Sequence, residues 1–169
     1  MDYYEFLQNK QDYGADGGFE PLFMPDCLFD FQVALTEWAI RKGRAAIFAD
    51  CGMGKTLMQL VWAENVVRKT GKPVLILTPL AVSGQTLDEA EKFGIEAQRA
   101  TVGKNPLCIQ VTNYARLHHF DCSNYGGVVC DESSILKNFD CTYKAAITEF
   151  MRSIPYRLLC KAKAAPNDW

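Results

Sequence analysis

The stretch that decides the fold is AAIFADCGMGKTLMQLVWAENVVRKTG, residues 45–71. It opens with a short apolar run typical of a buried strand, and it continues through a glycine-rich turn into a segment with apolar residues at helical spacing. Arg68 and Lys69 lie in the expected last turn of that helix, and Gly71 follows as a C-terminal cap. We therefore predict a strand, a tight loop and a helix in direct succession.

The loop over residues 49–56 has the residue types that hold phosphate groups. Glycines let backbone N–H groups turn toward phosphate oxygens, a lysine reaches the β- and γ-phosphates, and a hydroxyl side chain binds Mg²⁺. The usual pattern begins with glycine, where this chain has Ala49, and an ordinary glycine turn would look similar. The strand before and the helix after favour a nucleotide site. Its expected nucleotide-binding residues are Cys51, Gly52, Met53, Gly54, Lys55 and Thr56, with Thr56 also a ligand of Mg²⁺.

Beyond this stretch, apolar strand patterns alternate with amphipathic helix patterns. Helices are expected over residues 31–42, 56–71, 85–93 and 142–152, and the first three should stop at Gly43, Gly71 and Gly94. Strands are expected over residues 45–49, 73–79, 95–102, 107–113, 126–132 and 156–162. The run over residues 73–79 is almost continuously apolar, as in strands buried on both faces of a parallel sheet. The alternation predicts an α/β fold with a mostly parallel sheet and helices on both faces.

Composition favours one intracellular domain. The chain has 169 residues, 49% of them hydrophobic, which suffices for one core and is short for two domains of about 100–150 residues each. A formal charge of −2 gives no overall basic surface for nucleic acid, so such contacts need a local patch. Seven cysteines without a CxxC pair, and no apolar run of signal or membrane-spanning length, indicate a reduced, cytoplasmic protein. Residues 1–20 are expected to be a flexible lead-in, and residues 21–169 to form the domain.

A second motif, GGVVCDESS over residues 126–134, supplies acidic side chains at the end of a predicted strand. The carboxyl ends of parallel strands meet at one edge, so Asp131 and Glu132 should lie near Lys55. Asp131 suits the Mg²⁺ shell, and Glu132 suits the orientation of an attacking water. The alternative is that Asp131 caps the next turn and Glu132 is solvated. The preceding phosphate loop favours the catalytic interpretation for Lys55, Asp131 and Glu132.

Together these motifs resemble the first RecA-like domain of superfamily 2 helicases and translocases, over about residues 21–168, with DESS in place of a DEAD or DEAH box. The sequence is most similar in character to Swi/Snf-like enzymes of phages and prophages. The resemblance implies a RecA-like P-loop NTPase fold, ATP and Mg²⁺ as cofactors, and nucleic acid as partner, with DNA favoured over RNA. It also implies that the protein works in the cytoplasm of a bacterial cell or a phage-infected host.

The resemblance also implies roles for residues outside the phosphate loop. Gln32, about 23 residues before Lys55, matches a glutamine that reads adenine, although it is also consistent with a polar residue on an exposed helix face. The segments LTPLAVSGQ, VTNYARL and ILKNFD resemble loops that contact the nucleic-acid backbone. Their candidate contacts, which are equally consistent with strand ends, caps or solvated side chains, are Thr78, Ser83, Thr112, Asn113 and Lys137.

The sequence departs from the family in two places. Lys161 and Lys163 stand where small hydroxyl residues usually connect the γ-phosphate site to the nucleic-acid track. The chain ends at Trp169, without a second RecA-like lobe to close the site and supply an arginine. We expect the isolated lobe to bind ATP weakly, to hydrolyse it poorly or not at all, and to self-associate through its exposed docking face.

Three functional interpretations remain open. The chain is the ATP-binding lobe of a helicase or translocase, or a non-enzymatic nucleotide- or partner-binding module that modulates a full-length helicase. A small-molecule P-loop kinase is less favoured, because DESS and Gln32 have no place in it.

Overall fold

The computed structural model describes residues 17–49 and 53–162. In these ranges six strands form one sheet in the order β1-β6-β5-β2-β4-β3, and every neighbouring pair is parallel. The strands are β1 (Arg44–Phe48), β2 (Val74–Thr78), β3 (Ala97–Arg99), β4 (Ile109–Asn113), β5 (Gly127–Cys130) and β6 (Tyr156–Lys161). The predicted α/β fold with a parallel sheet is therefore confirmed.

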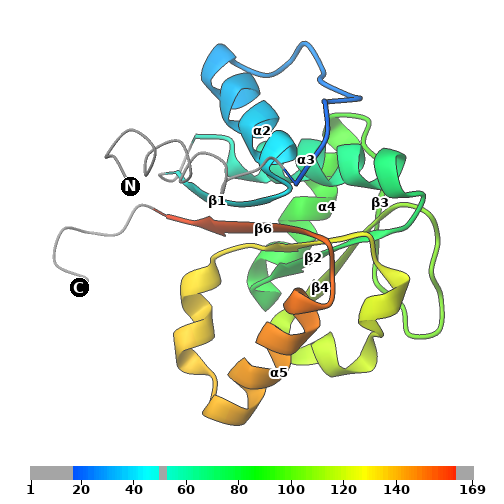
Figure 1. Ribbon diagram of the computed structural model, residues 1–169, viewed down its shortest axis with the longest axis vertical. Helices are drawn as coiled ribbons and strands as arrows, with labels where there is room; N and C mark the ends of the chain where they lie inside the picture. Colours follow the sequence, from blue (N-terminus) through cyan, green and yellow to red (C-terminus); the bar gives the residue numbers. More distant parts are fainter. Residues whose placement is uncertain (1–16, 50–52, 163–169) are drawn as a thin grey trace, which may run out of the picture.

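Helices cover both faces of the sheet (Figure 1). One face carries α2 (Asp30–Lys42), α3 (Lys55–Thr70) and α4 (Ser83–Lys92). The other carries α5 (Cys141–Arg152) and short 3₁₀ segments, among them η2 (Tyr114–His119) and η4 (Ser133–Asn138). The layers leave the carboxyl ends of all six strands together at one edge.

The central strands are buried on both faces, as their continuous apolar patterns predict. All five residues of β2 are buried: Val74 and Ile76 belong to the core under α2 and α3, while Leu75 and Leu77 belong to the core under α5. Successive side chains of a strand point to opposite faces, so one apolar run joins two cores.

The predicted helices are all present, and the glycines expected to stop three of them do so. Gly43, Gly71 and Gly94 follow α2, α3 and α4 with φ of 72°, 64° and 69°. Most strands are shorter than predicted, and β3 is shortened most: of residues 95–102 only Ala97–Arg99 form the strand, at the edge of the sheet where β4 is the single neighbour.

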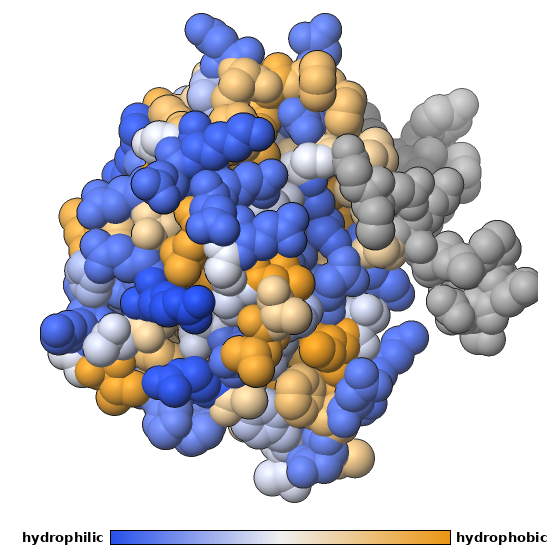
Figure 2. Space-filling view, turned by 180° about the vertical axis from the view of Figure 1, so that it is seen from behind, coloured by the Kyte–Doolittle hydropathy of each residue, from blue (hydrophilic) through white to orange (hydrophobic). Residues whose placement is uncertain are grey.

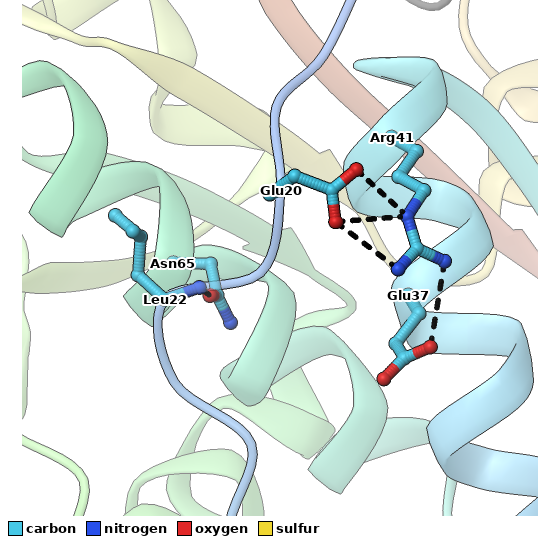
Figure 3. Close-up of polar contacts among 5 residues, drawn as sticks. All are labelled: Glu20, Leu22, Glu37, Arg41 and Asn65. Atoms are coloured by element: carbon cyan, nitrogen blue, oxygen red, sulfur yellow. Dashed lines mark hydrogen bonds and ion pairs between the residues drawn. The ribbon is translucent and has the colours of Figure 1, made fainter.

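The segment before α2 is held against α2 and α3 (Figure 3). The amide of Asn65 on α3 accepts hydrogen bonds from the backbone N–H groups of Leu22 (2.7 Å) and Phe23 (2.9 Å), and it donates to the carbonyl of Phe23 (2.7 Å). Glu20 forms an ion pair with Arg41 at 3.2 Å. Residues 18 and 19 lie in the segment expected to be a flexible lead-in, and their backbone N–H groups donate to carbonyls of Arg41 and Ile40 on α2. This part of the segment therefore contacts the helices.

Large apolar side chains on the surface are dispersed. Figure 2 shows apolar residues as separate patches among hydrophilic ones on the face opposite to the view of Figure 1. Within residues 17–49 and 53–162, no helix has the length and apolar character needed to cross a membrane.

We predict that Asn65→Leu lowers the free energy of unfolding by about 2–4 kcal/mol, because it removes the buried amide that accepts from two backbone N–H groups and donates to a carbonyl. Urea unfolding followed by circular dichroism measures this. The matched control is Asn124→Leu, at an exposed position, with an expected change within about 0.5 kcal/mol. Equal effects of the two substitutions would contradict the role of Asn65.

Candidate nucleotide-binding site

The phosphate loop follows β1 and leads directly into α3. Gly54 precedes the helix with φ 71° and ψ 33°, a left-handed conformation that glycine adopts without steric cost. A Cβ atom at Gly54 would lie 2.0 Å from Nε2 of Gln32, so the close approach also requires glycine. The N–H groups of the first helical turn have no partners within the helix and suit an anion. Cys51 and Gly52 lie outside the described residues.

Lys55, Asp131 and Glu132 contact one another, as predicted. Lys55 begins α3, and the acids directly follow β5, two strands away from β1 in the sheet. Nζ of Lys55 donates to Oε1 of Glu132 and lies 3.6 Å from Oδ1 of Asp131. The arrangement places one cation beside two carboxylates at the edge where the phosphate loop lies.

The carboxylates control the charge of Lys55. Burial by itself lowers the pKa of the Lys55 ammonium, but the hydrogen bond to Glu132 and the charges of Asp131 and Glu132 outweigh it and raise the pKa above its ordinary value of 10.5. Asp131 is only 3% exposed. Lysine therefore stays charged at neutral pH and offsets part of the negative charge at this edge.

Gln59 is a site residue that the sequence analysis missed. It is fully buried on α3, and its Nε2 donates to Oδ1 of Asp131 at 2.8 Å. Gln59 lies four residues after Lys55, so both side chains leave the same face of the helix. This spacing was the available signal: a glutamine among apolar residues, one turn beyond the phosphate-loop lysine.

Gln32 connects α2 to the phosphate loop. Its Oε1 accepts from the N–H of Phe29 at 2.9 Å, and its Nε2 donates to the carbonyl of Met53 at 3.0 Å. At 4% exposure it is not a residue on an exposed helix face. The adenine-reading role stays a prediction; in this structure both ends of the amide bond to the protein.

Thr56 and Asp131 supply the oxygen atoms expected to hold Mg²⁺. Thr56 is half-buried in the first turn of α3, and Asp131 follows β5 at the same edge of the sheet. Hydroxyl and carboxylate oxygens are the donors that Mg²⁺ takes, usually together with phosphate oxygens and water. The donor set therefore fits the ion.

The residues expected to contact nucleic acid do not form a single group. Thr78 and Ser83 are buried, and their hydroxyls bond each other at 2.8 Å. Ser83, Thr112 and Asn113 line a cleft of about 380 Å³ beyond the ends of β2 and β4. Lys137 is exposed on η4 and does not line this cleft.

Two arginines in the cleft were missed by the sequence analysis. Arg99 ends β3, and Arg116 lies in η2 after β4; both line the cleft beside Thr112 and Asn113. Their proximity follows from the pairing of β3 with β4, which brings residues 17 positions apart to one edge. The only local signals were an arginine within one predicted strand, Arg99, and another shortly after the next predicted strand, Arg116.

Lys161 ends β6, between the phosphate loop and the acids. Its carbonyl accepts from the N–H of Ala49 at 3.2 Å, which extends the pairing of β1 with β6. Among the described side chains, Asp131 and Glu132 each form an ion pair with Lys55, and neither forms one with Lys161. Lys163 lies outside the described residues.

We predict that Glu132→Gln lowers the pKa of Lys55, since it removes the carboxylate that accepts the lysine hydrogen bond. Because the pKa in the folded protein is raised, the stability from this pair is complete below pH 10.5 and is lost as the pH rises through the pKa of Lys55. The pH dependence of the Lys55 ¹³Cε shift measures it. The control, Glu91→Gln on the exposed face of α4, leaves the titration unchanged; an unchanged titration in Glu132→Gln would refute the pairing.

Comparisons with known proteins identify the fold. No family model matches the chain, and no curated protein matches its sequence significantly. A SWI2/SNF2 ATPase core of Sulfolobus solfataricus in complex with dsDNA superposes with a TM-score of 0.70 at 22% identity, covering 89% of this chain and 35% of that one. The UvsW helicase of bacteriophage T4 superposes with a TM-score of 0.67 at 12% identity, covering 92% and 59%. A second T4 UvsW structure gives 0.67 at 13%, covering 92% and 34%.

The chain spans between 34% and 59% of the length of these proteins, and the identities are low enough that the likeness is one of fold. The resemblance predicted from the sequence is confirmed at that level: the chain has the RecA-like α/β fold of the SWI2/SNF2 and UvsW cores.

Proposed function

We propose that this chain is the ATP-binding lobe of an ATP-dependent nucleic-acid helicase or translocase that acts on DNA and hydrolyses ATP with Mg²⁺ when a second lobe completes it. One observation carries the proposal: Lys55, at the start of α3, contacts both Asp131 and Glu132 at the end of β5. A lysine, a carboxylate for Mg²⁺ and a second carboxylate for water are the groups that phosphoryl transfer requires.

Each residue then has a defined task. The N–H groups at the start of α3 and the ammonium of Lys55 bind the phosphates, while Thr56 and Asp131 hold Mg²⁺, which offsets the phosphate charge. Lys55 has to move from Glu132 toward the phosphates when nucleotide binds. That movement frees the Glu132 carboxylate to orient water, so the contact of Lys55 with Glu132 separates when nucleotide binds.

The cleft beyond β2 and β4 is the proposed contact with the DNA backbone. Arg99 and Arg116 provide the local positive charge that the net charge of −2 does not, and the polar groups of Thr112 and Asn113 donate or accept hydrogen bonds. The SWI2/SNF2 neighbour was solved with dsDNA, which supports DNA as the ligand. Arginines suit phosphate because the guanidinium donates two parallel hydrogen bonds.

A second RecA-like lobe, or a second copy of this chain, is the proposed partner at the same edge of the sheet. Phe48 at the end of β1 is 63% exposed, and Leu80 after β2 is 74% exposed. Both are large apolar side chains beside the phosphate loop and the cleft, where closure of the site has to occur.

We place the protein in the cytoplasm.

The first experiment titrates Mg·ATP into the chain by calorimetry. We expect Lys55→Ala to weaken binding at least tenfold, because a charge-assisted hydrogen bond to phosphate contributes about 1.5–3 kcal/mol. The control is Lys92→Ala at the C-terminus of α4, on the opposite edge of the sheet, with no change expected. Binding without phosphate release, even with duplex DNA, would support an isolated lobe that awaits its second lobe; no binding would refute the proposal.

The second experiment measures the affinity for duplex DNA as a function of salt. Arg99→Ala and Arg116→Ala should each weaken binding several-fold and reduce the slope of log K against log salt by about 1, because each removes one phosphate contact. Arg152→Ala is the matched control: it is exposed at the end of α5, at the opposite edge of the sheet. If all three variants lose affinity equally, the cleft is not the DNA site.

A further inference from the structure

The backbone of Glu132 is unusual. With φ 49° and ψ 55° it is the one non-glycine residue in the described ranges that has positive φ. A residue with a Cβ atom pays a steric cost in this left-handed region, and such conformations persist only when the surroundings hold them. Glu132 is also the residue whose side chain reaches Lys55. The question is which contact holds it.

The peptide group that joins Asp131 to Glu132 is held from the side by Tyr114. The phenol of Tyr114 donates to the carbonyl oxygen of Asp131 at 2.6 Å, and the N–H of Asp131 donates to the carbonyl of Leu77 at 2.8 Å. The first bond fixes the plane of the peptide that immediately precedes the φ rotation of Glu132. The second keeps Asp131 in line with β2, so the turn has to occur at Glu132 itself.

Tyr114 is well placed to act as a fixed donor. Its ring is 2% exposed and packs near Phe139, with ring centroids 6.2 Å apart. The hydroxyl of Tyr143 donates to the backbone carbonyl of Tyr114. Burial raises the pKa of the Tyr114 phenol, and the neighbouring Cys130 and Asp131 raise it further. The hydroxyl therefore keeps its proton at every physiological pH.

We propose that Tyr114 is a positioning residue whose hydroxyl, through the Asp131 carbonyl, holds Glu132 in its left-handed conformation and so directs the Glu132 carboxylate toward Lys55. This inference deepens the proposed function, because Glu132 is the group assigned there to orient water. It gives the buried hydroxyl of Tyr114 a task that packing alone does not require, since phenylalanine fills the same space.

The test compares Tyr114→Phe with Tyr125→Phe in the free protein by NMR. Tyr125 is a matched control: it is equally buried in the same core, and its hydroxyl donates to Gln110 at 2.9 Å, near the amino ends of β4 and β5. Both substitutions remove one buried hydroxyl and keep the ring. Chemical shifts and scalar couplings report the sign of φ at residue 132, and nuclear Overhauser effects between their side chains report the contact of Lys55 with Glu132.

We expect Tyr114→Phe to move residue 132 out of the positive-φ region and to weaken the nuclear Overhauser effects between the side chains of Glu132 and Lys55, while Tyr125→Phe changes neither. If Tyr114→Phe does not fold, Tyr143→Phe, which loosens the anchor of Tyr114, is expected to shift the same signals in the same direction.

Positive φ at residue 132 and unchanged nuclear Overhauser effects between Glu132 and Lys55 in Tyr114→Phe would overturn the inference. The NMR measurements need no nucleotide, so they are independent of the proposed function. Failure of the wild-type chain to bind Mg·ATP would refute the proposed function, whereas the torsion at residue 132 would still decide whether Tyr114 positions Glu132.

Discussion

The contact of Lys55 with Asp131 and Glu132 is the interaction on which the site depends. One ammonium group beside two carboxylates leaves a net negative charge at the edge of the sheet, which a divalent cation complements. Under the proposed function, phosphates that drew Lys55 away would leave both carboxylates without their cation and would so favour Mg²⁺ at the same edge.

The parallel sheet makes this contact possible. Lys55 and Asp131 are far apart along the chain, yet the strands that precede them, β1 and β5, end at the same edge with only β6 between them. Parallel strands all finish on one side, and in open α/β sheets ligands bind there. The cleft lined by Arg99 and Arg116 lies at the same edge, beyond β2 and β4, so the candidate nucleotide and DNA sites share one surface of the sheet.

A layer of buried polar groups fixes the acids and the phosphate loop. Gln59 holds the carboxylate of Asp131, Tyr114 holds its carbonyl, and Gln32 joins α2 to Met53. Buried polar groups cost free energy unless they are paired, so each of these bonds has one favoured geometry. Tyr114 also directly follows Asn113, which lines the cleft. Its backbone therefore adjoins the candidate DNA contact, while its hydroxyl bonds to Asp131.

The sequence by itself determined the local elements and predicted which charged side chains meet at the edge of the sheet. Helical spacing and cap glycines identified α2, α3 and α4, the continuous apolar run identified β2, and the residue types of the loop and of DESS predicted that Lys55, Asp131 and Glu132 would meet. These are local signals, carried by periodicity and by motifs of a few residues.

Only the tertiary structure decided which polar side chains come together and which atoms they bond. Gln32 bonds to Met53, Thr78 bonds to Ser83, and Arg99 joins Arg116 in a cleft, because strand order and helix packing bring together residues with no local signature of contact. The same holds for the left-handed turn at Glu132: its conformation is set by a tyrosine 18 positions earlier in the chain, across the sheet edge.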